Sequence, residues 1–215
     1  MKNKKISIVG LGGVGSHTAI TLMNNGFKNL TLVDFDTIDP SNLNRQIMTN
    51  IENIGKYKAQ ALKDLSSEIL NDSSNIVAIN KRFQKTEAQF LKDSDFIVDA
   101  IDTVTNKLEL IEFAQENNIP IISALGTGNK FDPLNLKYSS IYSTQTCPLA
   151  RVIRRESKKR NLNDFPVVYS TENASKKNIA SNGRHAPSSM IFVPGICGFM
   201  LANYVINFFG QKYER

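Results

Sequence analysis

The sequence predicts an α/β fold with a doubly wound, mostly parallel sheet and helices on both faces. Two observations lead to this prediction. Short runs rich in Ile and Val alternate with longer helical stretches through the first half, and a glycine-rich segment follows the first run directly. Strand–helix–strand alternation is typical of parallel sheets, and nearly continuous apolar runs are typical of strands that are covered on both faces.

The first half is expected to contain five strands, at residues 6–9, 30–33, 76–79, 96–98 and 119–122. Helices are predicted between them at residues 16–24, 58–70, 87–91 and 105–117. The second half adds predicted strands at 134–141, 167–169 and 190–193, an amphipathic helix at 147–160, and an apolar C-terminal helix. Residues 170–189, with many Ser, Asn, Lys and Gly and little apolar content, predict a mobile crossover loop.

Composition limits the class of protein. The chain has 215 residues, 41% of them hydrophobic and 21% charged, which suits one soluble globular domain and excludes a disordered or fibrous protein. A net charge of +6 permits a polyanionic partner without requiring one. The two cysteines cannot build a disulfide scaffold or a four-thiolate zinc site, so a reducing, cytoplasmic environment is expected.

No membrane segment is predicted. The apolar stretch before the glycine-rich segment is too short for the core of a signal peptide. The apolar stretch at 193–209 contains Pro194, Asn203 and Asn207 and falls short of a spanning helix, so a helix in the core or at a subunit interface is expected there.

The glycine-rich segment indicates a phosphate-binding loop. Gly10, Gly12 and Gly15 form the pattern G-x-G-x-x-G between a predicted strand and a predicted helix, the context in which the backbone can approach a phosphate at a helix start. Asp34 ends the next strand, where its carboxylate can accept hydrogen bonds from ribose hydroxyls. These features predict a Rossmann-like nucleotide site; the alternative is a glycine turn needed only for close helix–strand packing.

The following segment argues against a dinucleotide. Arg45, and Lys58 at the start of a helix, would supply the extra positive charge that a triphosphate needs and could stabilise charge during transfer at the α-phosphate. Asp102 follows the fourth strand at the carboxyl end of the sheet, where a hard oxygen ligand for Mg²⁺ would be useful. The alternatives are solvated surface charges for the two cations and a helix N-cap for Asp102.

Taken together, these motifs resemble those of a known family. The chain carries Gly-x-Gly-Gly-x-Gly-Ser from Gly10, Asp-x-Asp from Asp34, Ser-Asn-Leu-x-Arg-Gln from Ser41, Gly-x-x-Lys from Gly55, and a later Asp102. The combination resembles the ubiquitin-activating-enzyme-like adenylyltransferases, which include the ThiF, MoeB and HesA proteins.

The resemblance implies ATP and Mg²⁺ as cofactors. It implies that Gly13 contacts phosphate, that Asp34 holds the ribose, and that Asn42 and Arg45 line the nucleotide. It further implies that Lys58 contacts phosphates and that Asp102 works with magnesium. The shared chemistry is the attack of a carboxylate on the α-phosphate of ATP, which gives an acyl-adenylate and pyrophosphate. By this resemblance, Arg45, Lys58 and Asp102 are the catalytic residues.

The second half narrows the resemblance. The CxxC pairs of members that act on sulfur carriers are absent, so no zinc is expected. The segments 126–133, 147–156 and 167–172 look like those of the tRNA threonylcarbamoyladenosine dehydratase branch. The implied reaction activates the threonyl carboxylate of the modified adenosine, which its ureido group then attacks to close a ring. The implied organisation is one domain over 1–215, with an ATP-binding half at 1–125 and a half for substrate, tRNA and dimer contacts at 126–215.

Four cations on the helix at 147–160 independently suggest a polyanion contact. Arg151, Arg154, Arg155 and Lys158 follow helical spacing and share one stripe, and Leu149, Val152 and Ile153 are expected on the other side, facing the core. Such a stripe can contact a phosphate backbone, here that of tRNA; the alternative is a solvated face without a ligand.

Several features leave alternatives open. Family members carry an N-terminal helical arm whose arginine reaches the triphosphate of the partner in a homodimer; Lys2, Lys4 and Lys5 do not obviously replace it. Cys147 is expected to be structural rather than a reactive thiol, Cys197 to lie in the core, His17 to face solvent, and His185 to lie in the mobile loop.

Four functions therefore compete. They are the tRNA dehydratase, an adenylyltransferase for a sulfur-carrier protein, a dinucleotide-dependent oxidoreductase, and a non-catalytic relative that binds nucleotide or RNA. The sequence leaves open a sulfur-transfer partner protein and a monovalent cation near residues 126–132.

Overall fold

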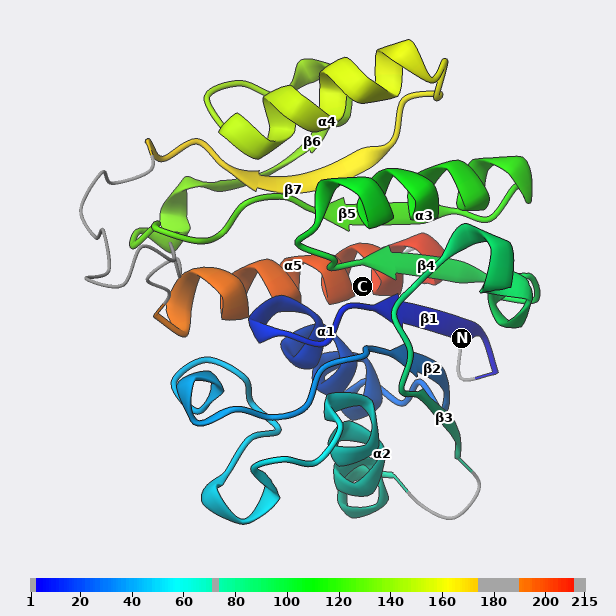
Figure 1. Ribbon diagram of the computed structural model, residues 1–215, viewed down its shortest axis with the longest axis vertical. Coiled ribbons are helices and arrows are strands. Elements are labelled where there is room, and N and C mark those ends of the chain that lie inside the picture. Colours follow the sequence, from blue (N-terminus) through cyan, green and yellow to red (C-terminus); the bar gives the residue numbers. More distant parts are fainter. Residues whose placement is uncertain (1–2, 71–73, 174–189, 211–215) are drawn as a thin grey trace.

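The computed structural model describes residues 3–70, 74–173 and 190–210, and these form one sheet flanked by helices (Figure 1). The sheet has seven strands within the described residues, in the order β3-β2-β1-β4-β5-β7-β6. Neighbouring strands are parallel except for β6, which runs antiparallel to β7. The strands are β1 (Lys5–Val9), β2 (Asn29–Val33), β3 (Asn75–Ile79), β4 (Phe96–Asp99), β5 (Ile121–Ala124), β6 (Leu136–Ser140) and β7 (Pro166–Ser170).

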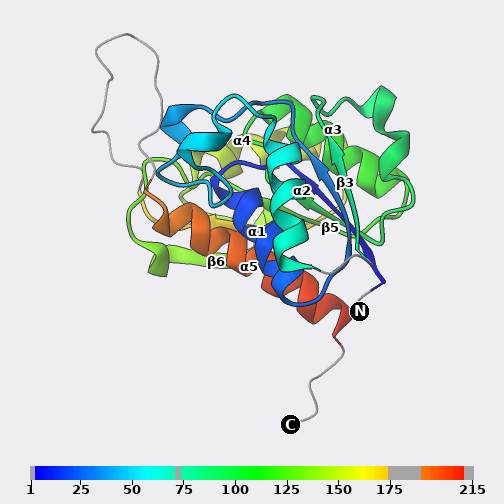
Figure 2. The ribbon, with the colours of Figure 1, turned by 90° about the horizontal axis from the view of Figure 1, so that it is seen from below.

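Two hydrophobic cores lie on the two faces of this sheet. The helices are α1 (Gly13–Asn24), α2 (Lys58–Ile69), α3 (Val104–Glu116), α4 (Pro148–Lys159) and α5 (Phe192–Phe209). Apolar side chains of α1, α2 and α5 belong to one core, and those of α3 and α4 belong to the other. The ribbons of these two groups of helices lie on opposite sides of the sheet (Figures 1 and 2). Side chains that alternate along β1 supply both, Ile6 and Ile8 to the first and Val9 to the second. The predicted doubly wound fold is therefore confirmed.

The topology determines where a ligand can bind. β1 pairs with β2 on one side and with β4 on the other, so the chain winds away from β1 in both directions. A crevice forms outside the carboxyl ends of the strands at such a switch point. The glycine loop follows β1 at that point.

Three sequence predictions need correction. Residues 190–193 are not a strand: α5 begins at Phe192, and Pro194 lies in its first turn, where its missing N–H costs no hydrogen bond. The predicted helix at 87–91 is a 3₁₀ segment, Lys85–Leu91, with non-helical backbone at Ala88. The strand predicted at 119–122 is displaced to Ile121–Ala124, after Pro120, which has no N–H for a ladder.

The remaining elements agree with the predictions to within a few residues. The strand predicted at 134–141 is shorter, because 3₁₀ turns at Pro133–Asn135 and Ile141–Ser143 flank β6. The predicted crossover loop lies mostly outside the described residues; its beginning at 170 is the end of β7.

α5 begins one residue before the predicted apolar stretch at 193–209 and is long enough to be compared with membrane helices. Its 18 residues have a mean hydropathy of 1.5, enough in length and composition to cross a membrane, contrary to the sequence estimate. Its buried residues, among them Val193, Cys197 and Leu201, instead join the core with α1. A core helix passes the same test, and this burial confirms the expected core position. Phe199 and Phe208 remain about half exposed.

Candidate active site

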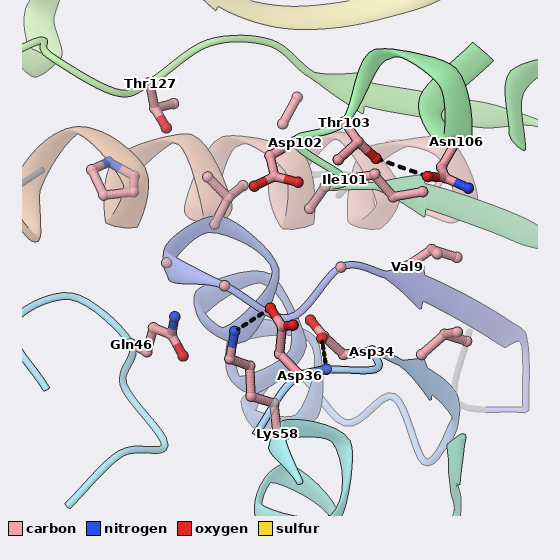
Figure 3. A pocket seen from close by; sticks show the side chains of 18 of the residues that line it. Val9, Asp34, Asp36, Gln46, Lys58, Ile101, Asp102, Thr103, Asn106 and Thr127 are labelled. Carbon is pink, nitrogen blue, oxygen red and sulfur yellow. Dashed lines mark hydrogen bonds and ion pairs between the residues drawn. The ribbon is translucent and has the colours of Figure 1, made fainter. Parts of the chain in front are cut away.

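A cavity of about 520 Å³ lies at the carboxyl ends of the parallel strands. It brings together most of the nucleotide-site residues predicted from the sequence. Those that line it are Gly10, Gly12, Gly13, Asp34, Asn42, Arg45, Lys58 and Asp102. Figure 3 shows Asp102 and Thr127 on one side of the cavity and Asp36 and Lys58 on the other.

The glycine loop forms the floor of the cavity. Gly10 has φ +90°, and a Cβ there would lie 2.6 Å from the carbonyl oxygen of Ala100, so no larger residue fits. Gly12 is the N-cap of α1 and provides no side-chain cap, which leaves N–H groups at the helix start for an anion. A Cβ at Gly13 would lie 3.1 Å from that of Pro194. The backbone is thus accessible to a phosphate.

Gly15 is placed differently from the other glycines. It does not line the cavity, and a Cβ there would lie 1.8 Å from the carbonyl oxygen of Gly10. The expectation that Gly15 contacts the nucleotide is therefore not supported. Gly15 instead allows α1 to approach the end of β1 closely. The alternative explanation of the loop, a turn needed for helix–strand packing, therefore applies to this one glycine.

Asp34 is held by the backbone directly after β2. Its Oδ2 accepts from the N–H of Leu11 at 2.6 Å, and its Oδ1 accepts from the N–H of Asp36 at 2.8 Å. Burial raises the pKa of Asp34, and these two backbone hydrogen bonds partly offset the effect. The carboxylate is therefore fixed in orientation and retains lone pairs for the hydroxyls of a ligand.

The two predicted cations differ in their surroundings. Arg45 is half-buried, and its guanidinium donates to the carbonyl of Ser41 at 2.7 Å and to Asn44 Oδ1 at 3.0 Å. Lys58 is buried, and its ammonium lies 3.0 Å from a carboxylate oxygen of Asp36 (Figure 3). An arriving triphosphate would therefore meet an ammonium already oriented toward the cavity by an acidic neighbour. Asp36 belongs to the Asp-x-Asp motif, but no role was predicted for it from the sequence.

The end of β3 adds residues that sequence reasoning missed. Lys81 and Arg82 line the cavity, and the guanidinium carbon of Arg82 lies 3.8 Å from the ring centroid of Phe35. They follow a predicted strand, and a basic pair at a strand's carboxyl end could have suggested them.

Gln46 is a second omission, although it belongs to the quoted Arg-Gln motif. It lines the cavity and is only 4% exposed, and its Oε1 has no hydrogen-bond partner within the described residues. A buried amide oxygen without a partner is costly, so a ligand that donates to it would be stabilised.

Asp102 suits a magnesium ion that is also bound by phosphates. Its exposed carboxylate lines the cavity, and it makes no hydrogen bond or ion pair within the described residues. The N-cap of α3 is Thr103, so the helix-cap alternative for Asp102 is wrong. No group of three or more His, Cys, Asp or Glu residues in the described chain could hold a metal unaided. One carboxylate together with substrate phosphates and water is nevertheless a usual set of Mg²⁺ ligands.

The four cations of the basic stripe on α4 differ in their contacts: three are exposed, and Arg154 is hydrogen-bonded within the fold. Arg151 is exposed, and Arg155 pairs with Glu156 at 2.9 Å. Arg154 instead donates to the carbonyl and to Oγ1 of Thr144 at 2.6 and 2.7 Å, and Lys158 lies over the Tyr142 ring. Arg154 is therefore anchored in the fold and does not stand free beside the other three.

The opposite side of α4 also departs from expectation. Its buried residues are Ala150, Ile153 and Ser157, whereas Val152 is half-buried. Leu149 faces the cavity, so α4 connects the site to the basic surface.

Of the other candidate residues, His17, Cys147 and Cys197 do not line the cavity. Cys147 and Cys197 are both buried, and burial raises the pKa of Cys197 to about 12. His17 is buried, contrary to expectation, and its Nδ1 lies 2.7 Å from the carbonyl of Gly13. His185 and Lys2 lie outside the described residues.

Lys4 and Lys5 are used elsewhere. They form ion pairs with Asp95 and Asp93 near the amino end of β1, at the opposite end of the sheet from the cavity.

Fold and cavity together define an α/β nucleotide-binding protein of the Rossmann type with a site suited to a triphosphate. The sequence profile of the ThiF family matches residues 1–215, and the chain belongs to that family.

The chain is similar to tRNA-modifying enzymes. The chain is 29% identical to the tRNA threonylcarbamoyladenosine dehydratase of Bacillus subtilis, over 96% of this chain and 87% of that protein. It is 36% identical to tRNA threonylcarbamoyladenosine dehydratase 2 of Saccharomyces cerevisiae over 82% of this chain, but it spans only 40% of that longer relative. The crystal structure of the Escherichia coli dehydratase TcdA in complex with ATP matches with a TM-score of 0.87 and 26% identity, over 96% of this chain and 85% of that one.

Proposed function

We propose that this protein is an ATP-dependent tRNA threonylcarbamoyladenosine dehydratase that works by adenylylation. The observation that carries the proposal is the single cavity in which the uncapped start of α1, the fixed Asp34 carboxylate, two cations and the Asp102 carboxylate all meet. Adenylylating enzymes act on different carboxylates, and the similarity to the Bacillus subtilis dehydratase over nearly the whole chain favours tRNA as the substrate here.

Each group has a task in this reaction. Asp34 accepts hydrogen bonds from the ribose, and the N–H groups around Gly12 and Gly13 bind phosphate. Arg45 and Lys58 stabilise the negative charge that increases on the phosphates when the carboxylate attacks. Asp102, with the phosphates, would hold Mg²⁺, which neutralises charge on the pyrophosphate leaving group.

The proposed sequence has two bond-forming steps. A threonyl carboxylate oxygen attacks the α-phosphorus of ATP, the bond to the β,γ-phosphates breaks, and pyrophosphate leaves. The ureido group of the same nucleoside then attacks the activated carbonyl carbon, loses a proton, and expels AMP. The carboxylate oxygen leaves with AMP, so the nucleoside loses water in net terms and becomes cyclic.

The decisive experiment uses purified protein with ATP, Mg²⁺ and tRNA that carries threonylcarbamoyladenosine. Mass spectrometry of the digested tRNA should show the cyclic nucleoside, and the undigested reaction mixture should contain an equal amount of AMP. Omission of ATP should abolish both. The same analysis of cells with and without the gene checks the reaction in vivo. ATP bound without any cyclic product would instead favour a non-catalytic nucleotide- or RNA-binding relative.

The main alternative is adenylylation of a sulfur-carrier protein. ATP–pyrophosphate exchange separates the two functions, because the proposed enzyme should exchange only when modified tRNA is added, and the alternative only when a carrier protein is added. A sulfur-transfer partner protein remains part of the proposal as an assisting factor. We also propose a cytoplasmic location, because the proposed substrate is tRNA.

We also propose a homodimer. Large apolar side chains at the start of α5 are exposed, namely Met190, Ile191, Phe192 and Phe199, and burial of such a group in a subunit contact would be favourable. Light scattering after size exclusion should give twice the chain mass, and Phe192→Asp with Phe199→Asp should give a folded monomer. A monomeric wild-type protein at micromolar concentration would contradict the dimer.

A further inference from the structure

A fully buried lysine lies directly beneath the cavity. Lys107 on α3 has no exposed surface, and its ammonium donates to Asp99 Oδ2 at 2.7 Å, Ser123 Oγ at 3.1 Å and the carbonyl of Ala124 at 2.8 Å. An ammonium has three donors, so every one is satisfied. None of these residues was singled out by the sequence analysis.

Asp99 completes the network and is also fully buried. Its Oδ2 accepts from Ser123 Oγ at 2.5 Å as well as from Lys107, and its Oδ1 accepts from the N–H of Ile101 at 3.0 Å. Asp99 and Ser123 are register partners on adjacent strands. The network therefore joins the end of β4, the end of β5 and α3.

The network lies where the cavity walls begin. Residues 100–103, which follow Asp99, line the cavity and include Asp102; residues 124–128, which follow Ser123, form another part of the wall. The carbonyl of Ala100 also lies against Gly10, where any Cβ would come within 2.6 Å. Three cavity segments thus meet around one buried ion pair.

Stability alone does not account for such a pair. Removing two charges from water is expensive, and replacing a buried ion pair with apolar residues is often neutral or stabilising. A completely satisfied polar network does hold backbone segments in a defined relative position. Its effect here should be on geometry at the cavity more than on the free energy of unfolding.

We infer that Lys107, with Asp99 and Ser123, is a positioning residue for adenylylation: it orients the Asp102 carboxylate relative to the glycine loop and residues 124–128 without touching ATP. The turnover measurement that tests this inference rests on the proposed function. The ATP-binding measurement does not depend on it. It assigns a functional reason to a charge that the fold otherwise buries at a cost.

The test variant is the neutral double substitution Asp99→Asn with Lys107→Met, which leaves no unpaired buried charge. We expect Mg²⁺ to strengthen ATP binding to the wild type, and that gain to fall about 10-fold in the double variant. This is the lower end of the effect of partners that hydrogen-bond a metal ligand directly, because the network acts on Asp102 only through the backbone. ATP affinity without Mg²⁺ should change less than about threefold, because the floor of the cavity is unaltered. Calorimetric titrations with ATP, with and without Mg²⁺, measure both values.

Turnover provides the second readout. The kcat for the cyclic nucleoside should fall by a similar factor while the KM for ATP stays nearly constant. The matched control is Lys85→Met, which removes ion pairs to Glu112 and Glu116 on the outer side of the same helix and should change neither value. A wild-type protein that binds Mg-ATP and makes no cyclic nucleoside would contradict the proposed function, and the titrations would still decide the inference.

A double variant with wild-type kcat and wild-type Mg²⁺ dependence overturns the inference. Equal losses of ATP affinity with and without Mg²⁺ also overturn it, since the network would then support only the fold. If the double variant does not fold, Ser123→Ala takes its place, because it keeps the ion pair and removes one hydrogen bond from each partner. It should reduce the Mg²⁺ effect several-fold, and an unchanged Mg²⁺ effect in this variant overturns the inference.

Discussion

At the scale of single residues, Arg45 and Lys58 are two of the cations that line the cavity, and we propose that they contact the triphosphate. We predict that Arg45→Ala or Lys58→Ala lowers kcat by about 100-fold while the dissociation constant of ATP rises much less, because charge on the phosphates changes most in the transition state. Steady-state rates and ATP titrations measure the two effects. Lys56→Ala is the control, since Lys56 is exposed and does not line the cavity. Wild-type kcat in both variants would make these residues surface charges.

His17 makes stability depend on pH. Burial lowers its pKa from 6.5, with the hydrogen bond to the Gly13 carbonyl acting in the opposite direction. The unfolded chain therefore binds a proton more readily than the folded one, and this residue's contribution to stability falls as the pH drops below about 6.5. We expect the melting temperature to fall less on acidification from pH 7.5 to 5.5 in His17→Gln than in the wild type. Equal falls would exclude His17 as the cause.

At the scale of elements, α1 and α5 approach so closely that Gly198 is required between them. A Cβ on Gly198 would lie 2.5 Å from the carbonyl of Val14 and 2.8 Å from Cβ of His17. Gly198→Ala should therefore destabilise the fold by about 1–3 kcal/mol through overpacking. Urea unfolding measures the change. Gly126→Ala is the control, because the nearest atom to a Cβ there is 3.7 Å away, and the prediction is wrong if both substitutions cost the same.

We predict that the basic stripe on α4 binds tRNA independently of ATP chemistry. Replacing the three outward cations, Arg151, Arg155 and Lys158, by Ala should weaken tRNA binding about equally across sequences. It should also flatten the salt dependence by up to ~0.7–0.9 log unit per lost phosphate contact. ATP binding should persist, since none of the three lines the cavity. Filter binding at several salt concentrations provides the measurement.

Arg154 serves as the internal comparison for this stripe. Its two hydrogen bonds to Thr144 predict that Arg154→Ala lowers the melting temperature and leaves the salt slope nearly unchanged. An unchanged slope in the triple variant would leave the stripe a solvated face.

At the scale of the whole molecule, the cavity should prefer a triphosphate to a dinucleotide. We predict that ATP with Mg²⁺ raises the melting temperature more than NAD does at matched concentration, because Arg45, Lys58 and Lys81 line one cavity. Binding at 100 times the dissociation constant adds about 2.7 kcal/mol of stability. A thermal-shift assay compares the ligands, and a larger shift with NAD would reject the adenylylation function.

The architecture and most of the cavity follow from the sequence pattern. Alternating apolar runs and helical stretches specify the parallel sheet, and the glycine loop requires its strand–turn–helix context whatever else the chain contains. Gly10, Asp34 and Asp102 each follow a strand that is parallel to its neighbours, so topology alone brings them to the same edge of the sheet.

Which polar side chains are exposed and which are bonded within the fold depends on how the elements pack. Arg154 fits the same helical stripe as Arg155 but is hydrogen-bonded to Thr144. Lysine is usually a surface residue, but Lys107 is fully buried. His17 is covered by α5, which lies far along the chain. The physical reason is that local pattern specifies backbone geometry and the face of an element, whereas the partner of a side chain comes from another element and depends on how the two pack.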